Sequence, residues 1–124
     1  SDIEAHFTTV AQRQVGALVV GNDGLFMNRT VEIATLGIRY AMPTIFQTPE
    51  FAAAGGLMSY GSSNTDAYHQ VGIYTGRILN GEKPGDLPVV QSTKIEMIVN
   101  LKTAKALGVT VPLPLLARAD AVIE

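Results

Sequence analysis

Three short segments of the chain carry the side chains best suited to chemistry, and each follows an apolar stretch. They offer amides, carboxylates, hydroxyls and aromatic rings, which suit a small polar or zwitterionic ligand. A carboxylate can meet an ammonium group, and a ring can cover an apolar side chain. Several of these residue types, such as Asn22 and Asp23, also form ordinary turns. The candidate ligand-binding residues are Asn22, Asp23, Phe26, Gln47, Glu50, Ser59, Tyr60, Gly61 and Ser62.

Sequence motifs of known catalytic sites are not present. The stretch from Gly56 to Ser63 has the glycine spacing of a phosphate-binding loop, but it lacks the lysine that must follow the second glycine. Neither a G-x-G-x-x-G nor a G-x-S-x-G sequence occurs. His6 and His69 are the only histidines, and the chain has no cysteine. We therefore expect no enzymatic activity, no cofactor and no metal site.

The composition describes a globular domain rather than a disordered segment. Of 124 residues, 47% are hydrophobic and 16% are charged. The net charge of −2 and the pI of about 5.6 argue against nucleic acid as a partner, because phosphate binding needs a clustered basic face. No apolar run reaches the roughly 18 residues that a membrane span needs.

Hydrophobic periodicity predicts helices that alternate with short strands. The glycine-bounded run VGALVVG, residues 15–21, is typical of a strand buried on both faces of a parallel sheet. Ser63 or Asn64 caps a long helix with a predicted buried stripe of Ala67, Val71, Tyr74 and Ile78. The other expected helices are residues 3–14, 29–41 and 50–54, a short one between Asn100 and Gly108, and 113–123. The other expected strands are residues 44–47, 57–60, 88–92 and 95–100.

This alternation predicts an α/β fold with a three-layer, open, mostly parallel sheet. In such sheets the ligand site lies beyond the carboxyl ends of the strands. The three polar segments follow predicted strands, so we expect them to gather at one edge of the sheet.

An ordered series of motifs, strongest over residues 51–124, resembles the carboxyl-terminal part of the ABC-transporter substrate-binding protein family, which includes tryptophan/tyrosine-binding members. The resemblance rests on AAGGLMSYG (53–61), DAY (66–68), GRIL (76–79), GEKP (81–84), DLPV (86–89), IVNLKTAKALG (98–108) and LARAD (116–120). It implies a type I periplasmic-binding-protein fold whose two lobes close around a ligand. It also implies delivery of that ligand to an ABC permease, and a periplasmic or lipoprotein location outside the membrane.

The resemblance further implies that the chain is a fragment of a larger protein, with a signal peptide upstream. Residues 1–61 would belong to the carboxyl-terminal lobe. Residues 62–124 would supply a crossover helix with terminal strands and helices that pack on the other lobe. The family's cleft loops correspond to Asn22–Asp23, Gln47–Glu50 and Ser59–Gly61, although Gly24 stands where many relatives have proline. Exposed apolar surface would make the fragment self-associate, for example as a domain-swapped dimer.

Two other classes of protein fit the same pattern less well. A ligand-sensing domain of a transcription regulator has the same fold and would follow a DNA-binding helix-turn-helix. A small flavodoxin-like enzyme or receiver domain would need a phosphate loop or an acidic cluster on its first strand, and the sequence has neither. If the chain is part of a two-lobed substrate-binding protein, half of the ligand site lies outside the chain. Residues 1–124 alone should then bind amino acids weakly or not at all.

Overall fold

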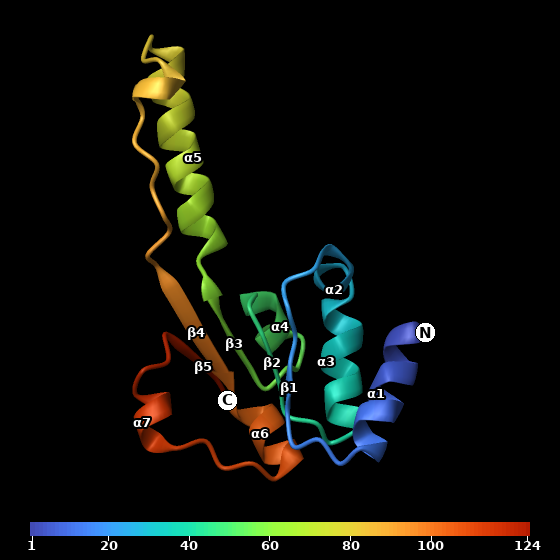
Figure 1. Cartoon of the computed structure of the whole chain (residues 1–124). Helices are drawn as coiled ribbons and strands as arrows, with labels where there is room; N and C mark the ends of the chain where they lie inside the picture. Colours follow the sequence, from blue (N-terminus) through green and yellow to red (C-terminus); the bar gives the residue numbers. More distant parts are fainter. The chain divides into compact units, whose positions relative to one another are not determined.

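Helices and strands alternate along the computed structural model, which describes residues 1–124 (Figure 1). The contacts divide the chain into two compact units, residues Ser1–Gly61 with Glu96–Glu124 and residues Ser62–Ile95. The elements in order are α1 Asp2–Gln12, β1 Leu18–Val19, α2 Gly24–Met27, α3 Thr30–Arg39, β2 Thr44–Phe46, α4 Pro49–Ala53, β3 Met58–Ser62, α5 Asn64–Leu79, η1 Pro84–Asp86, β4 Ile95–Asn100, α6 Leu101–Leu107, α7 Leu113–Leu116 and β5 Ala121–Ile123.

The strands form one sheet in the order β1-β2-β3-β4-β5. β1 pairs parallel with β2, β2 with β3, and β4 with β5. β3 and β4 run in opposite directions (Figure 1), and the N–H of Asn100 at the end of β4 donates to the carbonyl of Leu57 just before β3 at 2.9 Å. The predicted α/β class with a mostly parallel sheet is therefore confirmed.

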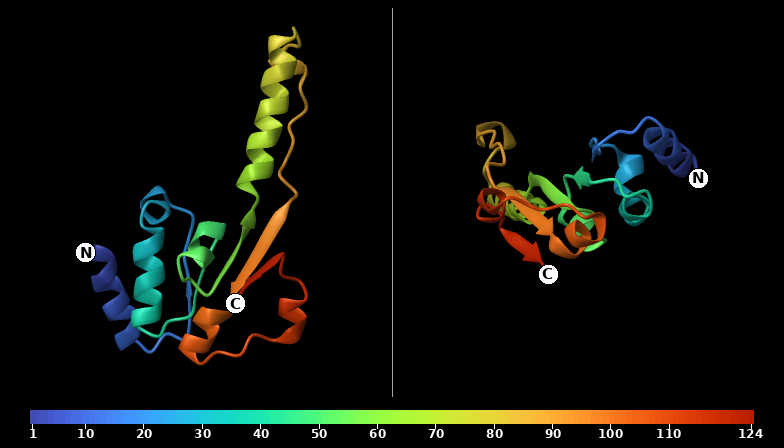
Figure 2. Two further views of the ribbon diagram at one scale, coloured as in Figure 1. Left: turned by 180° about the vertical axis from the view of Figure 1, so that it is seen from behind. Right: turned by 90° about the horizontal axis from the view of Figure 1, so that it is seen from below.

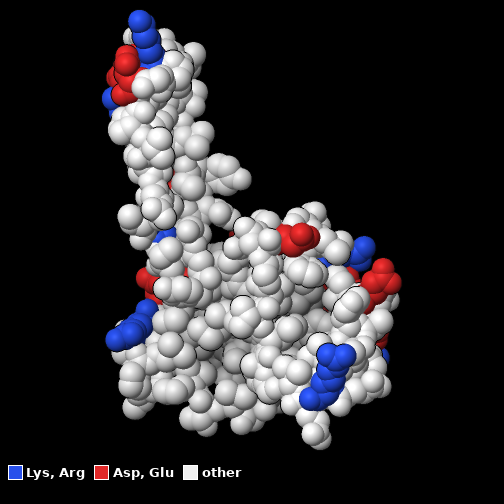
Figure 3. Space-filling model, in the orientation of Figure 1, with Lys and Arg blue, Asp and Glu red and all other residues white.

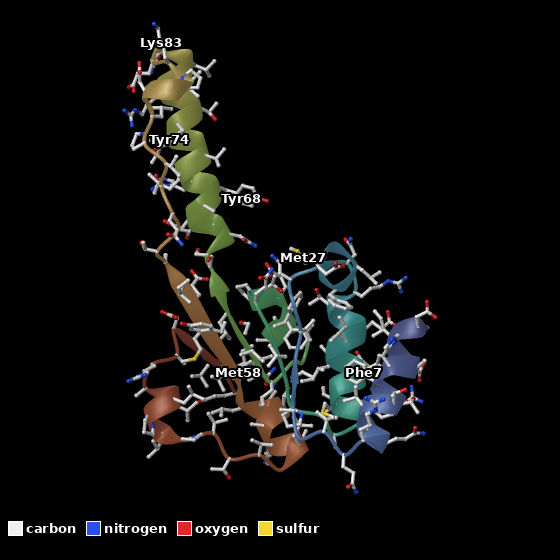
Figure 4. The ribbon with its side chains drawn as sticks, viewed as in Figure 1. Phe7, Met27, Met58, Tyr68, Tyr74 and Lys83 are labelled. Atoms are coloured by element: carbon white, nitrogen blue, oxygen red, sulfur yellow. The ribbon has the colours of Figure 1, made fainter.

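The core of the first unit lies where its helices meet the sheet. Because β1, β2 and β3 are neighbours in chain order, right-handed connections place α3 and α4 on the same face, and these two helices contact each other. Phe7 of α1 lies between α1 and α3 (Figure 4). The buried core side chains are Phe7, Ile33, Ala34, Leu36, Met42, Phe46 and Phe51.

A buried polar cluster holds the corner between β4 and α6. The side chain of Asn100 donates from Nδ2 to the carbonyl of Ala52 at 2.9 Å. Its Oδ1 accepts from the N–H of Thr103 at 3.1 Å, which confirms its predicted role as a helix cap. Thr103 Oγ1 donates to the carbonyl of Gly55 at 2.9 Å. These bonds join the β4–α6 corner to the turn after α4, which is 48 residues earlier in the chain.

The second unit consists of α5 and the segment that returns along it (Figure 2). Ser63 caps the helix by accepting from the N–H of Asp66, as predicted. Tyr74 faces the returning segment, and its hydroxyl donates to the carbonyl of Pro88 at 2.6 Å. The predicted buried stripe is wrong for this chain, because no residue of α5 is buried. The returning segment is too narrow to cover a whole helix face.

Three predicted elements differ from the structure in type, or by more than two residues at one end. β1 is confined to Leu18–Val19, and Val19 is 78% exposed, so the expected burial on both faces is wrong. Residues 88–92 form no strand, since no other strand lies beside them. The last predicted helix ends early because Asp120 turns toward β4. Its N–H donates to the carbonyl of Met97, its carboxylate accepts from the Met97 N–H, and β5 follows.

Removing the Asn100 side chain should destabilise the first unit. Asn100→Ala leaves the buried carbonyl of Ala52 and the N–H of Thr103 without their partners. We expect the free energy of unfolding to fall by roughly 2–4 kcal/mol. Urea denaturation followed by circular dichroism measures this difference. The control is Asn80→Ala, because Asn80 is exposed and should change stability by less than about 0.5 kcal/mol. Equal losses for both variants would contradict the role assigned to Asn100.

The ion pair in the second unit should titrate at low pH. A hydrogen bond from Arg77 lowers the pKa of Glu82 below its ordinary value of 4.5. A carboxyl group with a lowered folded-state pKa stabilises the fold above its unfolded-state pKa, and this contribution disappears as the pH falls through the folded-state value. In a carbon-detected NMR titration the Glu82 carboxyl should therefore have a midpoint below 4.5. Arg77→Gln should return the midpoint toward 4.5; an unchanged midpoint would be inconsistent with the pair.

Candidate ligand-binding site

Parallel pairing brings the carboxyl ends of β1, β2 and β3 to one edge of the sheet (Figure 1). The loop that leads into α2, the start of α4 and the end of β3 all lie at this edge. All of the predicted site residues except Ser62 belong to the first compact unit. The arrangement agrees with the expectation that these segments gather at one edge.

The loop after β1 presents Asn22 and Asp23 to solvent. Asp23 caps the short helix α2, and its Oδ1 accepts from the N–H of Leu25 at 2.8 Å. This bond fixes the carboxylate and engages one of its two oxygens. The side chain of Asn22 makes no hydrogen bond within the chain. Asp23 therefore has the ordinary turn-forming role considered above. Its second carboxylate oxygen is left for a ligand.

Phe26 has a different environment from that of the polar residues in its loop. Its ring is half-buried and packs against the core cluster. It also lines an apolar groove of about 400 Å³ that is bounded by α1, β1, α2 and α3. The exposed apolar side chains of this loop are instead Leu25 and Met27. Figure 4 labels Met27. Leu25 and Met27 are not among the residues predicted from the sequence, because an aromatic ring is the more usual cover for an apolar ligand group.

The loop after β2 combines a free amide, a free carboxylate and a buried hydroxyl. The side chains of Gln47 and Glu50 have no partner within the chain. Thr48 lies between them, is buried, and leaves its Oγ1 without a hydrogen bond. Buried hydroxyl groups are rarely unpaired in folded proteins. Thr48 was absent from the predicted site residues, although its place between two candidates was a signal that could have identified it.

The third segment lies within β3 rather than after it, because the strand extends to Ser62. Ser59 is almost fully buried, and its Oγ has no partner. It pairs in register with Phe46 of the core, so its side chain lies on the same face as that ring. Tyr60 is exposed and its hydroxyl group is free. Ser62 is exposed and belongs to the second unit.

A close backbone approach joins the second and third segments. A Cβ atom at Gly61 would lie 2.3 Å from the carbonyl oxygen of Gln47. Only glycine fits at this distance, since the obstructing atom is backbone and cannot rotate away. Gly61 therefore allows the carboxyl ends of β2 and β3 to meet, and it holds the Gln47 loop beside Tyr60.

The charged residues of the three segments themselves are acidic. Residues 14–28 and 40–61 contain Asp23 and Glu50 but no lysine or arginine. Figure 3 shows the charged side chains of the visible face in small, separate groups. No group of histidine, aspartate and glutamate in the chain is arranged to hold a metal ion. The edge is therefore suited to a cationic or ammonium group held by carboxylate and amide oxygens.

None of the helices has the length and apolar character that a membrane crossing requires. A second hollow, of about 670 Å³, lies inside the second unit between α5 and the returning segment. It contains none of the predicted site residues.

Comparison with known proteins identifies a family model and several structural neighbours. The model for "ABC transporter substrate binding protein" matches residues 1–123. No curated protein matches the chain. A conserved domain protein from Vibrio cholerae O1 biovar El Tor is 21% identical, with a TM-score of 0.86 over 98% of this chain and 40% of its own.

Two further solved structures are similar to this chain. An ABC domain from Streptococcus pneumoniae in complex with L-Trp is 25% identical, with a TM-score of 0.85 over 98% of this chain and 42% of its own. A ligand-free, open substrate-binding protein with adhesive properties from Clostridium difficile is 22% identical, with a TM-score of 0.68 over 99% of this chain and 40% of its own. The chain thus spans about two fifths of each neighbour.

The close approach at Gly61 gives a direct test of the site's framework. Gly61→Ala must move β3 away from Gln47, and we expect it to lower the free energy of unfolding by about 1–3 kcal/mol. The matched control is Gly24→Ala, where a Cβ would meet no atom within 4 Å. The control should be neutral or stabilising by up to about 1 kcal/mol. Denaturant titration compares the two variants, and equal stabilities would refute the steric argument.

Proposed function

The chain belongs to the ABC transporter substrate-binding protein family, and from this premise we propose that it is part of the solute-binding component of an ABC importer. In this role it binds a small molecule and presents it to a membrane permease. It works outside the cytoplasmic membrane, in the periplasm or as an anchored lipoprotein. It carries out no chemical reaction of its own.

The proposed ligand is a small polar or zwitterionic molecule, and an amino acid is the example we favour. Asp23 and Glu50 would face its ammonium group, while Asn22 and Gln47 would donate or accept hydrogen bonds. Tyr60, which is exposed at the same edge, would cover part of the ligand's side chain. The L-Trp complex of the Streptococcus pneumoniae neighbour supports this class of ligand, at 25% identity.

One observation carries this proposal. The edge gathers polar side chains that have no partner within the chain. Asn22, Gln47, Glu50 and Tyr60 make no internal hydrogen bond, and Thr48 is buried with an unpaired hydroxyl. Buried polar groups are normally paired within the fold, which makes the Thr48 hydroxyl an exception. The exposed side chains of Asn22, Glu50 and Tyr60 are hydrated, and a ligand can replace that water. A ligand would supply the missing partners.

We propose that these residues form one half of a site that closes on the ligand. The other half would come from a second lobe, as in a hinged binding protein. A ligand that contacts both lobes only when they are closed shifts the equilibrium toward the closed state. The permease would then recognise that state.

Titration of residues 1–124 with L-tryptophan and with glycine tests the proposal. Half a site should bind weakly, with a dissociation constant near or above ~1 mM, equivalent to about −4 kcal/mol. Amide chemical shifts should change for residues 22–23, 47–48, 50 and 60–61. The shifts of α5 residues should remain unchanged and serve as an internal control.

Two outcomes would contradict the proposal. Tight 1:1 binding in calorimetry would show that the site is complete without a second lobe. The ligand would also be tested at ~10 mM, about tenfold above the expected dissociation constant of ~1 mM. If the amide shifts of the three segments do not change at that concentration, this edge is not the binding surface.

A further inference from the structure

Thr48 occupies a helix-capping position but does not cap its helix. It is the N-cap residue of α4, where a threonine hydroxyl normally accepts a hydrogen bond from a backbone N–H of the first turn. In α2, α5 and α6 the side chains of Asp23, Ser63 and Asn100 make this bond. The N–H of Phe51, which a capping Thr48 would bind, donates instead to the Thr48 carbonyl at 3.0 Å. The Thr48 hydroxyl therefore makes no contribution to capping α4.

The unpaired hydroxyl of Thr48 is a cost to the ligand-free fold. Thr48 is 7% exposed, and its Oγ1 has no hydrogen-bond partner. Burying a hydroxyl group without a partner destabilises a protein, because the group loses its bonds to water. Valine has nearly the same shape as threonine and does not carry this cost. Stability alone would favour valine at this position, which points to a role of the hydroxyl outside the fold.

The backbone brings Thr48 to the carboxyl edge of the sheet. Its φ of −99° and ψ of 138° are extended, so it continues the conformation of β2, which ends at Phe46. Its Oγ1 is enclosed in the ligand-free chain. A rotation of about 120° around the Cα–Cβ bond moves the hydroxyl to another staggered position. A ligand bound at this edge can then pair with it.

The charges near Thr48 determine which ligand group suits its hydroxyl. Glu50 is exposed two residues further on, and residues 40–61 contain no lysine or arginine. Glu50 repels a carboxylate, whereas it attracts a protonated amine, which also has N–H groups to donate. A quaternary ammonium group carries the same charge but has no N–H, and proteins bind it with cages of aromatic rings. Tyr60 is the one exposed ring of residues 40–61, so this edge offers no such cage.

We propose that Thr48 makes the half-site selective for amines that carry N–H groups over quaternary ammonium compounds. Its Oγ1 accepts a hydrogen bond from the protonated amine of the ligand, while Glu50 supplies the opposite charge. The inference rests on the proposed function and adds the class of ligand group that this edge selects. A site with a buried acceptor rejects a ligand that lacks the matching donor, because the acceptor then stays unpaired.

L-Tryptophan and N,N,N-trimethyl-L-tryptophan form the test pair, because they share the positive charge, the carboxylate and the indole ring and differ in the N–H groups. Amide shifts of residues 1–124 give the dissociation constants for the wild type, Thr48→Val and Thr48→Ser. The wild type should bind the trimethyl compound about tenfold or more weakly than L-tryptophan. Thr48→Val should reduce this ratio to about twofold or less by weakening L-tryptophan binding, and Thr48→Ser, which keeps the hydroxyl, should preserve the ratio.

Thr44→Val is the matched control, because Thr44 is also a buried threonine of β2 but lies at the other end of the strand. It should leave the ratio of the two dissociation constants unchanged. Urea denaturation without ligand gives an independent measurement. Thr48→Val should raise the urea midpoint by about 0.5 M, because it removes the buried unpaired hydroxyl.

Several outcomes would overturn the inference. Equal affinities of the wild type for both compounds, with shifts in the three edge segments, would reject the selectivity and leave the proposed function standing. A ratio that Thr48→Val leaves unchanged would assign the selectivity to another group. A lower urea midpoint for Thr48→Val would show that the hydroxyl serves the fold. If neither compound shifts the edge segments, the proposed function itself fails, and this inference fails with it.

Discussion

The buried hydrogen bonds of Asn100 and Thr103 hold together parts of the chain that the sequence separates widely. At the corner between β4 and α6, the Asn100 side chain donates to the carbonyl of Ala52 near the end of α4. The Thr103 side chain donates to the carbonyl of Gly55 in the turn that leads into β3. The second unit, residues 62–95, lies between these segments in the sequence. A cluster of this kind costs free energy unless every group in it is paired. Here each Asn100 and Thr103 group described above has a partner, so the cluster fixes the position of α4 and β3 in the first unit.

The candidate site depends on that fixed position. α4 begins immediately after the Gln47–Thr48 loop, and β3 carries Tyr60 and Gly61. Asn100 and Thr103 hold the end of α4 and the turn before β3. The close contact between Gly61 and the Gln47 carbonyl holds the carboxyl ends of β2 and β3 together. Gln47, Thr48 and Tyr60 therefore lie on elements that are held at both ends. A binding protein gains from this, because an ordered site loses less conformational entropy when its ligand arrives.

Sequence patterns predicted the parts of this fold that local chemistry determines. Ser63, Asn100 and Gly108 set helix ends where capping rules place them, and Gly108 has the expected positive φ of 68°. The patterns failed where a residue distant in the sequence determines the local structure. Residues 113–123 look helical, but the bonds between Asp120 and Met97 turn the chain into a strand. The apolar stripe of α5 was expected to be buried, yet its burial would need surface that residues 1–124 do not supply. For the site, the edge and its segments were predictable from strand order, whereas the packing of Phe26 against the core and the unpaired hydroxyl of Thr48 became visible only in the structure.

The central claim is that the carboxyl edge of β1, β2 and β3 is a ligand half-site with affinity for an ammonium group. The most direct measurement is a crystal structure of the protein grown with saturating L-tryptophan. The account predicts the amino group of the ligand within hydrogen-bond distance of Asp23 or Glu50, with Gln47 and Tyr60 beside it. A ligand seated in the groove between α1 and β1, or along α5, with this edge empty would contradict the account.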